Sequence, residues 1–329
     1  MKKSKISSIS HAVLGFACAC TLGAASAHAQ PVTVNEPAGI NLGGTSFFDA
    51  LGKYTPGFIY QQYFQIQHYN SINGDNGRPV PVIKGTDFTA IVSLNQFIYV
   101  SPYHILGGVL GGMAILPLVD LNASFAPDSI VRLKANRGVG VGDITWGPFI
   151  AFPPVIRGGR PVFAQRIEFD VVSPSGSYDT SKDINPSSGF WSVNPYWAVT
   201  VLPTPKTEIS ARFSYLHNFS NTHPASSAPL PAGTTTQAGD AGWVNFTASY
   251  EVLPKLNVGL NGYYFKQFTD NQVDGVIQKG TEAESISMGP GGTYAFNQAN
   301  IAFLNVYLPV VKKNTASGFN VVLRYIHAF

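Results

Sequence analysis

The final stretch of the chain, residues 317–329, reads SGFNVVLRYIHAF. Its alternate positions are apolar or aromatic: Phe319, Val321, Leu323, Tyr325 and Phe329. In a strand, alternate side chains share one face while the main chain bonds to neighbouring strands. A strand that faces lipid needs one apolar face, and a terminal aromatic ring is suited to the membrane interface. The pattern indicates the last strand of an outer-membrane barrel, although a soluble edge strand ending on phenylalanine has the same pattern.

The other end of the chain has the features of a secretory signal peptide. Three lysines precede an apolar stretch at residues 12–25, and residues 27–29 read AHA, a small-residue cleavage pattern. The apolar stretch is too short to span a membrane as a helix. We expect residues 1–29 to be removed after export, and both cysteines of the precursor, Cys18 and Cys20, leave with them.

Charge and composition agree with an exported membrane protein. Three of the 21 basic residues lie in the signal, which leaves 18 against the 18 acidic residues. A formally neutral mature chain lacks the basic surface that a nucleic-acid partner needs, so none is expected. Charged residues make up 12% of the chain, which is about half the share typical of soluble domains. Low charge with many aromatic residues is typical of a sheet that faces lipid.

Alternation of apolar and polar residues continues through most of the mature chain. From residue 54 to the end, segments of about 10 to 15 residues alternate with turns that are short and long in succession. They amount to about twelve strands, an even number, with both ends on the side of the short turns. A soluble sandwich would carry its charges outside, whereas here they share the inward face. The fold class is therefore all-β, an antiparallel transmembrane β-barrel of about 12 strands at residues 54–329.

The facing of individual strands follows from the same alternation. In residues 58–69 we assign Phe58 and Phe64 to lipid and Gln65 to the lumen. In residues 87–100 we assign a second set to lipid: Phe88, Ala90, Val92, Leu94 and Ile98. Some residues do not fit, because glutamines fall on the lipid face and prolines lie within strands, where bulges or rims are expected. We interpret these residues as bulges or interface positions: Gln62, Gln96, Gln165, Pro148 and Pro195.

The inward positions supply the candidate functional residues. Polar candidates for the lumen are Arg166, Glu168, Asp170, Glu208, Arg212 and Asp143. Aromatic residues of the same inward assignment are Tyr63, Phe97, Tyr99, Phe149, Tyr196 and Trp243. The charges either shape a substrate path or orient a plug, or they only satisfy one another in a narrow barrel. The rings would favour flat apolar ligands, or they fill gaps.

A segment before the first strand has an unusual composition. Residues 30–53 contain apolar side chains, including Ile40, Phe47 and Leu51, among glycines. The segment could fold into the barrel as a small plug or form a free periplasmic tail. We keep both interpretations open.

Signals for catalysis or cofactors are weak. The mature chain has no cysteine nucleophile, and its serine, histidine and acidic residues form no recognisable catalytic arrangement. His217 and His223 share one external loop, where an ordinary solvated loop is the more common explanation than a metal site. The glycines at 138, 140 and 142 do not open a helix, as a nucleotide loop would. We expect no enzyme activity, no cofactor and no metal.

Four segments resemble a known family. They are residues 140–149 (GVGDITWGPF), 169–178 (FDVVSPSGSY), 189–195 (GFWSVNP) and 262–268 (GYYFKQF). Together they resemble the meta-pathway phenol-degradation family of outer-membrane proteins, over residues 41–329. The resemblance implies a bacterial outer-membrane barrel, often encoded with catabolic enzymes, that admits hydrophobic or aromatic substrates. It provides no catalytic residues to carry over.

These observations predict a function. We expect an outer-membrane channel that admits small hydrophobic or aromatic compounds, such as phenol-type catabolic substrates, by passive diffusion. Its partners would be outer-membrane lipid and lipopolysaccharide, the barrel-assembly machinery through the C-terminal strand, and a small apolar or aromatic substrate. The alternatives are a structural or adhesive barrel and, less in keeping with the residues, a barrel enzyme that acts on lipids.

Overall fold

In the described part of the chain, all of the helix or strand structure is β-strand. The computed structural model describes residue 40 and residues 42–329. The predicted signal peptide, residues 1–29, lies outside the described residues, as do residues 30–39 and 41 of the segment that follows it. Within the described part of the chain, no helix is long and apolar enough to cross a membrane.

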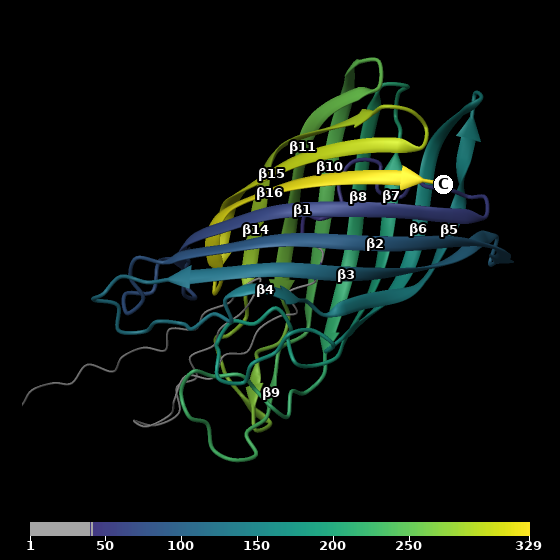
Figure 1. Cartoon of the computed structure of the whole chain (residues 1–329). Helices are drawn as coiled ribbons and strands as arrows, with labels where there is room; N and C mark the ends of the chain where they lie inside the picture. Colours follow the sequence, from purple (N-terminus) through teal and green to yellow (C-terminus); the bar gives the residue numbers. More distant parts are fainter. Residues whose placement is uncertain (1–39, 41) are drawn as a thin grey trace, which may run out of the picture.

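Twelve long strands form one antiparallel sheet that closes into a barrel (Figure 1). Closure occurs at β1 (Gly57–Ile72), which pairs with β2 (Asp87–Ile105) on one side and β16 (Ala316–Ala328) on the other. The remaining strands of the wall are β3 (Gly108–Ser124), β5 (Ile144–Arg157), β6 (Arg160–Ser173), β7 (Ser192–Val201), β8 (Thr207–Asn218), β10 (Ala241–Leu253), β11 (Leu256–Gln267), β14 (Glu284–Ala295) and β15 (Asn300–Lys313). The predicted barrel of about 12 strands is confirmed.

Four short strands supplement the wall. β4 (Gly138–Val141) pairs with β3 just before β5 begins. In the loops, β9 (Thr236–Gln237), β12 (Gln272–Val273) and β13 (Val276–Ile277) form a small separate sheet. Long connections such as residues 174–191 and 219–240 gather at this end of the barrel (Figure 1), whereas tight turns close the other end. In outer-membrane barrels the short-turn end is periplasmic, so the long loops face outside.

The C-terminal strand has the predicted facing and partner. Phe319, Leu323 and Tyr325 are exposed on the outer surface, whereas Val322 and Arg324 between them are buried inside. β16 pairs with β1 along its length. Beyond its last residue, the Phe329 amide still donates to the Phe58 carbonyl oxygen at 3.0 Å. The last aromatic residue therefore lies at the rim of the short-turn end, beside the first strand.

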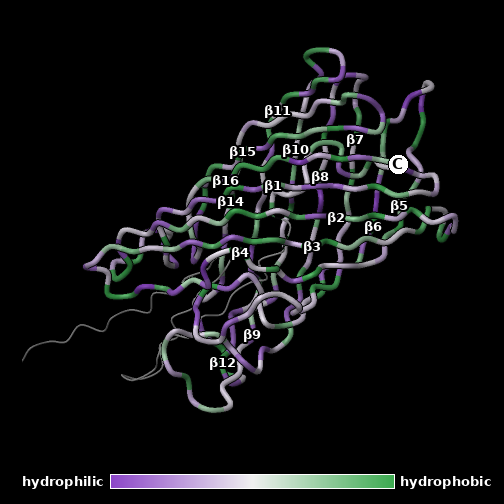
Figure 2. Tube along the Cα trace, viewed as in Figure 1, coloured by the Kyte–Doolittle hydropathy of each residue, from purple (hydrophilic) through white to green (hydrophobic). Residues whose placement is uncertain are grey.

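The outer surface of the barrel is apolar and rich in rings. Hydrophobic and hydrophilic residues follow one another along the strands (Figure 2). Trp197 of β7 stacks on Phe213 of β8 with ring centroids 5.7 Å apart. The outward Gln165, one of the residues that did not fit the alternation, accepts a hydrogen bond from the Trp197 indole N–H at 3.1 Å. A polar side chain on this surface is thus partnered by a neighbouring strand.

The facing predicted for β2 was wrong. The residues assigned to lipid are buried inside the barrel: Phe88, Ala90, Val92, Leu94 and Ile98. Phe97 and Tyr99 are instead 54% and 42% exposed on the outer surface, and the Tyr99 ring lies 4.8 Å from Phe58. Both faces of β2 carry apolar residues, so alternation alone does not choose between them. The register does, because Tyr99 lies opposite the outward-facing Phe58, and it turns Gln96 into the lumen.

Two prolines interrupt the hydrogen-bonded wall at the same level. Pairing between β5 and β6 is absent around Pro148, and pairing between β7 and β8 is absent around Pro195. Phe169 of β6 lies between these breaks and is paired with Pro195. Proline has no main-chain donor, so each ladder is broken where its bond would fall. Beside Pro148 the wall is so tight that a Cβ on Gly147 would lie 2.0 Å from the Phe169 carbonyl oxygen.

The end of β16 generates a testable prediction. We expect Phe329→Asp to lower the amount of barrel inserted in the outer membrane severalfold, because a carboxylate replaces the ring at the membrane interface. The measurement is the heat-modifiable, folded band in isolated outer membranes. Phe329→Tyr keeps the ring and is expected to insert like the native chain. Equal insertion of the aspartate variant would contradict an anchoring role for this ring.

Candidate functional site

The segment that precedes β1 runs inside the barrel. The amide of Gly43 donates to the Asn245 side-chain oxygen at 3.1 Å, and the Tyr307 hydroxyl donates to the Gly43 carbonyl oxygen at 2.6 Å. Further along, the Ala50 amide donates to the Thr200 hydroxyl at 3.0 Å. These partners lie on β10, β15 and β7, so strands from opposite parts of the wall contact one short segment. The main-chain groups of this irregular segment are thereby satisfied by side chains of the lumen.

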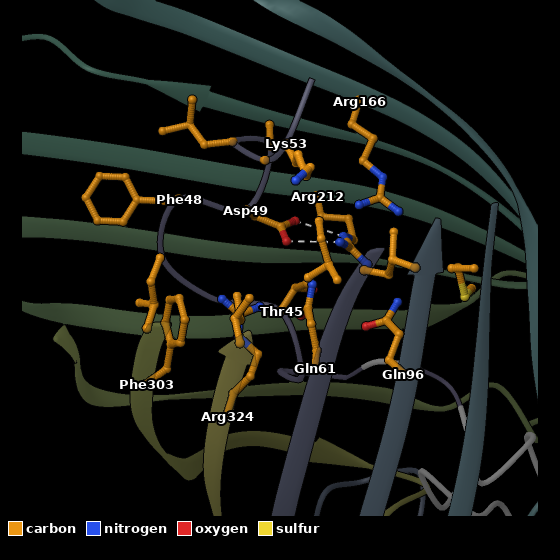
Figure 3. Close-up of a pocket in the computed structure, with 18 of the residues that line it drawn as sticks. Thr45, Phe48, Asp49, Lys53, Gln61, Gln96, Arg166, Arg212, Phe303 and Arg324 are labelled. Atoms are coloured by element: carbon orange, nitrogen blue, oxygen red, sulfur yellow. Dashed lines mark hydrogen bonds and ion pairs between the residues drawn. The ribbon is translucent and has the colours of Figure 1, made fainter. Parts of the chain in front are cut away.

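One buried ion pair fastens the segment to the wall. Both carboxylate oxygens of Asp49 accept hydrogen bonds from the Arg212 guanidinium, at 2.8 and 2.9 Å (Figure 3). The two side chains are 5% and 8% exposed. The guanidinium also lies 4.0 Å above the centre of the Tyr196 ring. Arginine binds a buried carboxylate strongly when it contacts both carboxylate oxygens and its guanidinium is stacked on an aromatic ring.

A second carboxylate beneath the segment has no cationic partner among the described residues and is held by hydrogen bonds. Glu208 is fully buried and accepts from the Phe48 amide at 3.0 Å. It also accepts from the hydroxyls of Thr247 and Ser249, at 3.0 and 2.8 Å, and from that of Ser210. Donors on three sides compensate the loss of water around this group. Glu208 therefore fastens the segment to β8 through its hydrogen bond with the Phe48 amide.

The segment lies between two spaces in the lumen. The larger cavity, about 650 Å³, occupies the part of the lumen nearer the short-turn end. A smaller cavity of about 80 Å³ lies toward the long loops. Ile40 borders both cavities. The lumen is thus divided where the segment crosses it.

The walls of the larger cavity differ in character. On β6 and β8, charged side chains line it, with Arg166 contacting Glu168 and stacking 3.9 Å from the centre of the Phe149 ring. On β2 and β3, the lining is apolar apart from Gln96 and includes Ile98 and Met113. The cavity therefore offers hydrogen bonds on one side and an apolar surface on the other.

The charged residues and tyrosines predicted for the lumen fall into four groups. Six line the larger cavity: Tyr63, Arg166, Glu168, Asp170, Tyr196 and Arg212. Glu208 faces inward but is covered by the segment. Tyr99 does not line the lumen, because the register of β2 turns it to the outer surface. Asp143 is buried among the long loops, where its carboxylate accepts from the amides of Gly176 and Ser188, at 3.2 and 2.8 Å.

Asp49 and Arg324 are charged residues of the site that sequence reasoning missed. Asp49 is the single carboxylate in residues 40–53, a signal that the segment needs a cationic partner. Arg324 lines the same cavity and had been passed over within an apolar strand. The apolar inner face of β2 was missed too, although Gln96 on the supposed lipid side already indicated the opposite facing. Among the described residues, no group of three or more histidine, cysteine, aspartate or glutamate side chains is placed to hold a metal ion.

A closed twelve-stranded barrel with an apolar outer surface and a cavity-bearing lumen is the architecture of outer-membrane channels, and the protein is an outer-membrane β-barrel. The chain belongs to the family described as "Putative MetA-pathway of phenol degradation", whose profile matches residues 70–325. The resemblance of the four sequence segments to this family is thereby confirmed.

Three solved structures were compared with this chain, and the first of them shares its fold. The COG4313 outer membrane channel from Pseudomonas putida F1 is 17% identical, with a TM-score of 0.73 over 87% of this chain and 100% of that chain. The transport unit of the Escherichia coli autotransporter AIDA-I is 10% identical, with a TM-score of 0.47 over 85% of this chain and 92% of that chain. The P. putida toluene transporter TodX is 9% identical, with a TM-score of 0.42 over 85% and 91%. Among curated proteins, no sequence matches this chain.

The Asp49–Arg212 pair generates a testable prediction. Asp49→Ala leaves Arg212 buried without its partner, which weakens docking of the segment by about 3–5 kcal/mol. We expect the segment to leave its place and single-channel conductance in planar bilayers to rise at least twofold. Asp75→Ala, which removes an exposed loop carboxylate, is the matched control and should leave conductance unchanged. Equal conductance of the native chain and Asp49→Ala would show that the segment does not limit the path.

Proposed function

We propose that the protein is a passive channel that lets small hydrophobic or aromatic compounds, including phenol-type molecules, cross the outer membrane. One observation carries the proposal: the inner faces of β2 and β3 form a surface from the smaller cavity to the larger that is apolar apart from Gln96. The buried residues of this surface, here called the apolar track, are Phe88, Ala90, Val92, Leu94, Ile98, Val100, Val109, Met113, Val119, Leu121 and Ala123.

The apolar track borders both cavities. Phe88, Val92 and Val119 line the smaller cavity, and Ile98 and Met113 line the larger one. An apolar solute that moves along such a surface keeps part of its area out of water throughout, at about 25 cal/mol per Å². A lumen lined on all sides by polar groups would offer no such gain. The arrangement therefore supports selection for apolar and aromatic solutes over sugars and ions.

The remaining features have natural roles in this proposal. The segment inside the lumen, residues 42–53, acts as a plug that narrows the path, and its polar contacts explain why the opposite wall carries charges. Transport of this kind needs no covalent step, so the protein acts without catalysis. Its surroundings are outer-membrane lipid and lipopolysaccharide, and the β16 end is the signal that the assembly machinery reads.

Uptake by intact cells tests the proposed function. A bacterial host without this chain is compared with the same host expressing it, and the initial uptake of radiolabelled naphthalene and lactose is measured. We expect faster naphthalene uptake with the channel, unchanged lactose uptake, and a naphthalene rate that persists when the inner-membrane potential is dissipated. Identical naphthalene uptake in both strains would contradict a channel for apolar compounds.

The apolar track generates a further prediction with a matched control. Val92→Asn places an amide on the track, whereas Ser93→Asn places the same side chain on the other face of β2. Loss of about 1 kcal/mol of apolar stabilisation along the path slows passage about fivefold. We expect that reduction in naphthalene uptake for Val92→Asn alone, with equal amounts of folded barrel. Equal uptake by both variants would place the path elsewhere.

A further inference from the structure

Arg324 is a buried cation that has no anionic partner among the described residues. It is 5% exposed and lines the larger cavity. Within the described part of the chain, no oxygen accepts a hydrogen bond from its guanidinium, and its Nε is both buried and unpaired. Burying an arginine without an acceptor is costly, because its donors lose water and gain nothing in return. An unpaired arginine in a cavity wall is therefore suited to a ligand that supplies the acceptor.

Two aromatic rings hold the guanidinium in place. Arg324 lies directly across from Tyr63 of β1 and Phe303 of β15 in the two ladders that flank β16. Its guanidinium carbon is 3.7 Å from the centre of the Phe303 ring and 5.7 Å from that of Tyr63. Figure 3 shows Phe303 beside Arg324 at the cavity wall. Such stacking engages the flat faces of the group and leaves the N–H donors along its edge for a ligand.

The other cations of the cavity are already engaged. Arg212 is paired with Asp49, and Arg166 contacts Glu168. The Lys53 ammonium donates to the main-chain oxygen of Phe329 at 2.6 Å, and that of Lys255 donates to the Phe296 carbonyl oxygen at 3.3 Å. Both lysines engage oxygens of the strand ends and turns, so they add positive charge at the short-turn rim of the cavity.

The carboxylates that line the cavity either pair with other arginines or lie far from Arg324 around the barrel, so an incoming anion can reach Arg324. Asp49 and Glu168 face arginines that partner them. The third lining carboxylate, Asp170, is on β6, which is separated from β16 by several strands in both directions around the barrel. Among the described residues, Arg324 is therefore the lining arginine whose charge is not met by a carboxylate.

We propose that Arg324 binds the carboxylate of a small aromatic acid, and that such acids are substrates of this channel. The planar carboxylate matches the two parallel donors of a guanidinium edge. The ring of the acid would lie against apolar lining residues such as Ile59, Ile98 and Ile326, which come from β1, β2 and β16 on the same side of the barrel. This inference rests on the proposed function and extends its substrate class from neutral compounds to aromatic carboxylates.

Binding of benzoate to the purified full-length barrel tests the inference. Affinities for benzoate and for the neutral benzyl alcohol are measured by calorimetry at pH 7 for the native chain, Arg324→Met and Arg78→Met. Arg78 is an exposed loop arginine, so its variant is the matched control. We expect benzoate to bind the native chain and the control alike, and about tenfold or more weakly to Arg324→Met. Affinity for benzyl alcohol should be the same in all three.

Two further measurements keep the test decisive if Arg324→Met inserts poorly. Phe303→Leu retains the charge but removes one stacked ring, and we expect severalfold weaker benzoate binding. The native chain should also bind benzoate more tightly than benzyl alcohol. Equal benzoate affinity in native and variant barrels, or no preference for benzoate over benzyl alcohol, would overturn the inference. The naphthalene assay separates the two proposals, since loss of benzoate recognition leaves naphthalene uptake intact.

Discussion

Every main-chain donor and acceptor at membrane depth must find a partner within the protein, because lipid offers none. The ladder between β1 and β16 meets this requirement, running from Ile59 opposite Ala328 to Ile72 opposite Ala316. It joins the two ends of the sheet and leaves no free edge. Once the barrel is closed, each strand has one face toward lipid and one toward the lumen, and the positions of all the functional residues follow from that division.

Main-chain donors and acceptors inside the lumen also need partners within the protein. In the part of the chain that the structure describes, residues 42–53 before β1 have no sheet partners. Side chains of the wall bind them instead, through Arg212, Asn245 and Glu208. These polar side chains are on β8 and β10, whereas β2 and β3 on the other side present mainly apolar residues to the lumen. The division into a polar wall and an apolar track is therefore a consequence of where the segment docks.

Alternation predicted the facing of a strand where its two faces differ in chemistry. In β6, Arg166 and Glu168 alternate with apolar residues. In β16 the outward Phe319, Leu323 and Tyr325 alternate with inward residues that include Arg324, so the inner and outer faces were evident. In β2 both faces are apolar, so the facing of Tyr99 depended on its register with β1. The ion pair of Asp49 with Arg212 joins residues 163 positions apart, and no local pattern encodes such a contact. The strands were thus predictable, while the site assembled between them was not.

The most direct test of the account is the location of a bound aromatic compound. A crystal of the barrel soaked with 4-bromophenol would show the bromine by its anomalous scattering. We expect the bromine inside the lumen, against the apolar track between the two cavities, near Ile98 and Met113. Bromine found only on the outer surface of the barrel, with the track unoccupied, would contradict the assignment of this surface as the path.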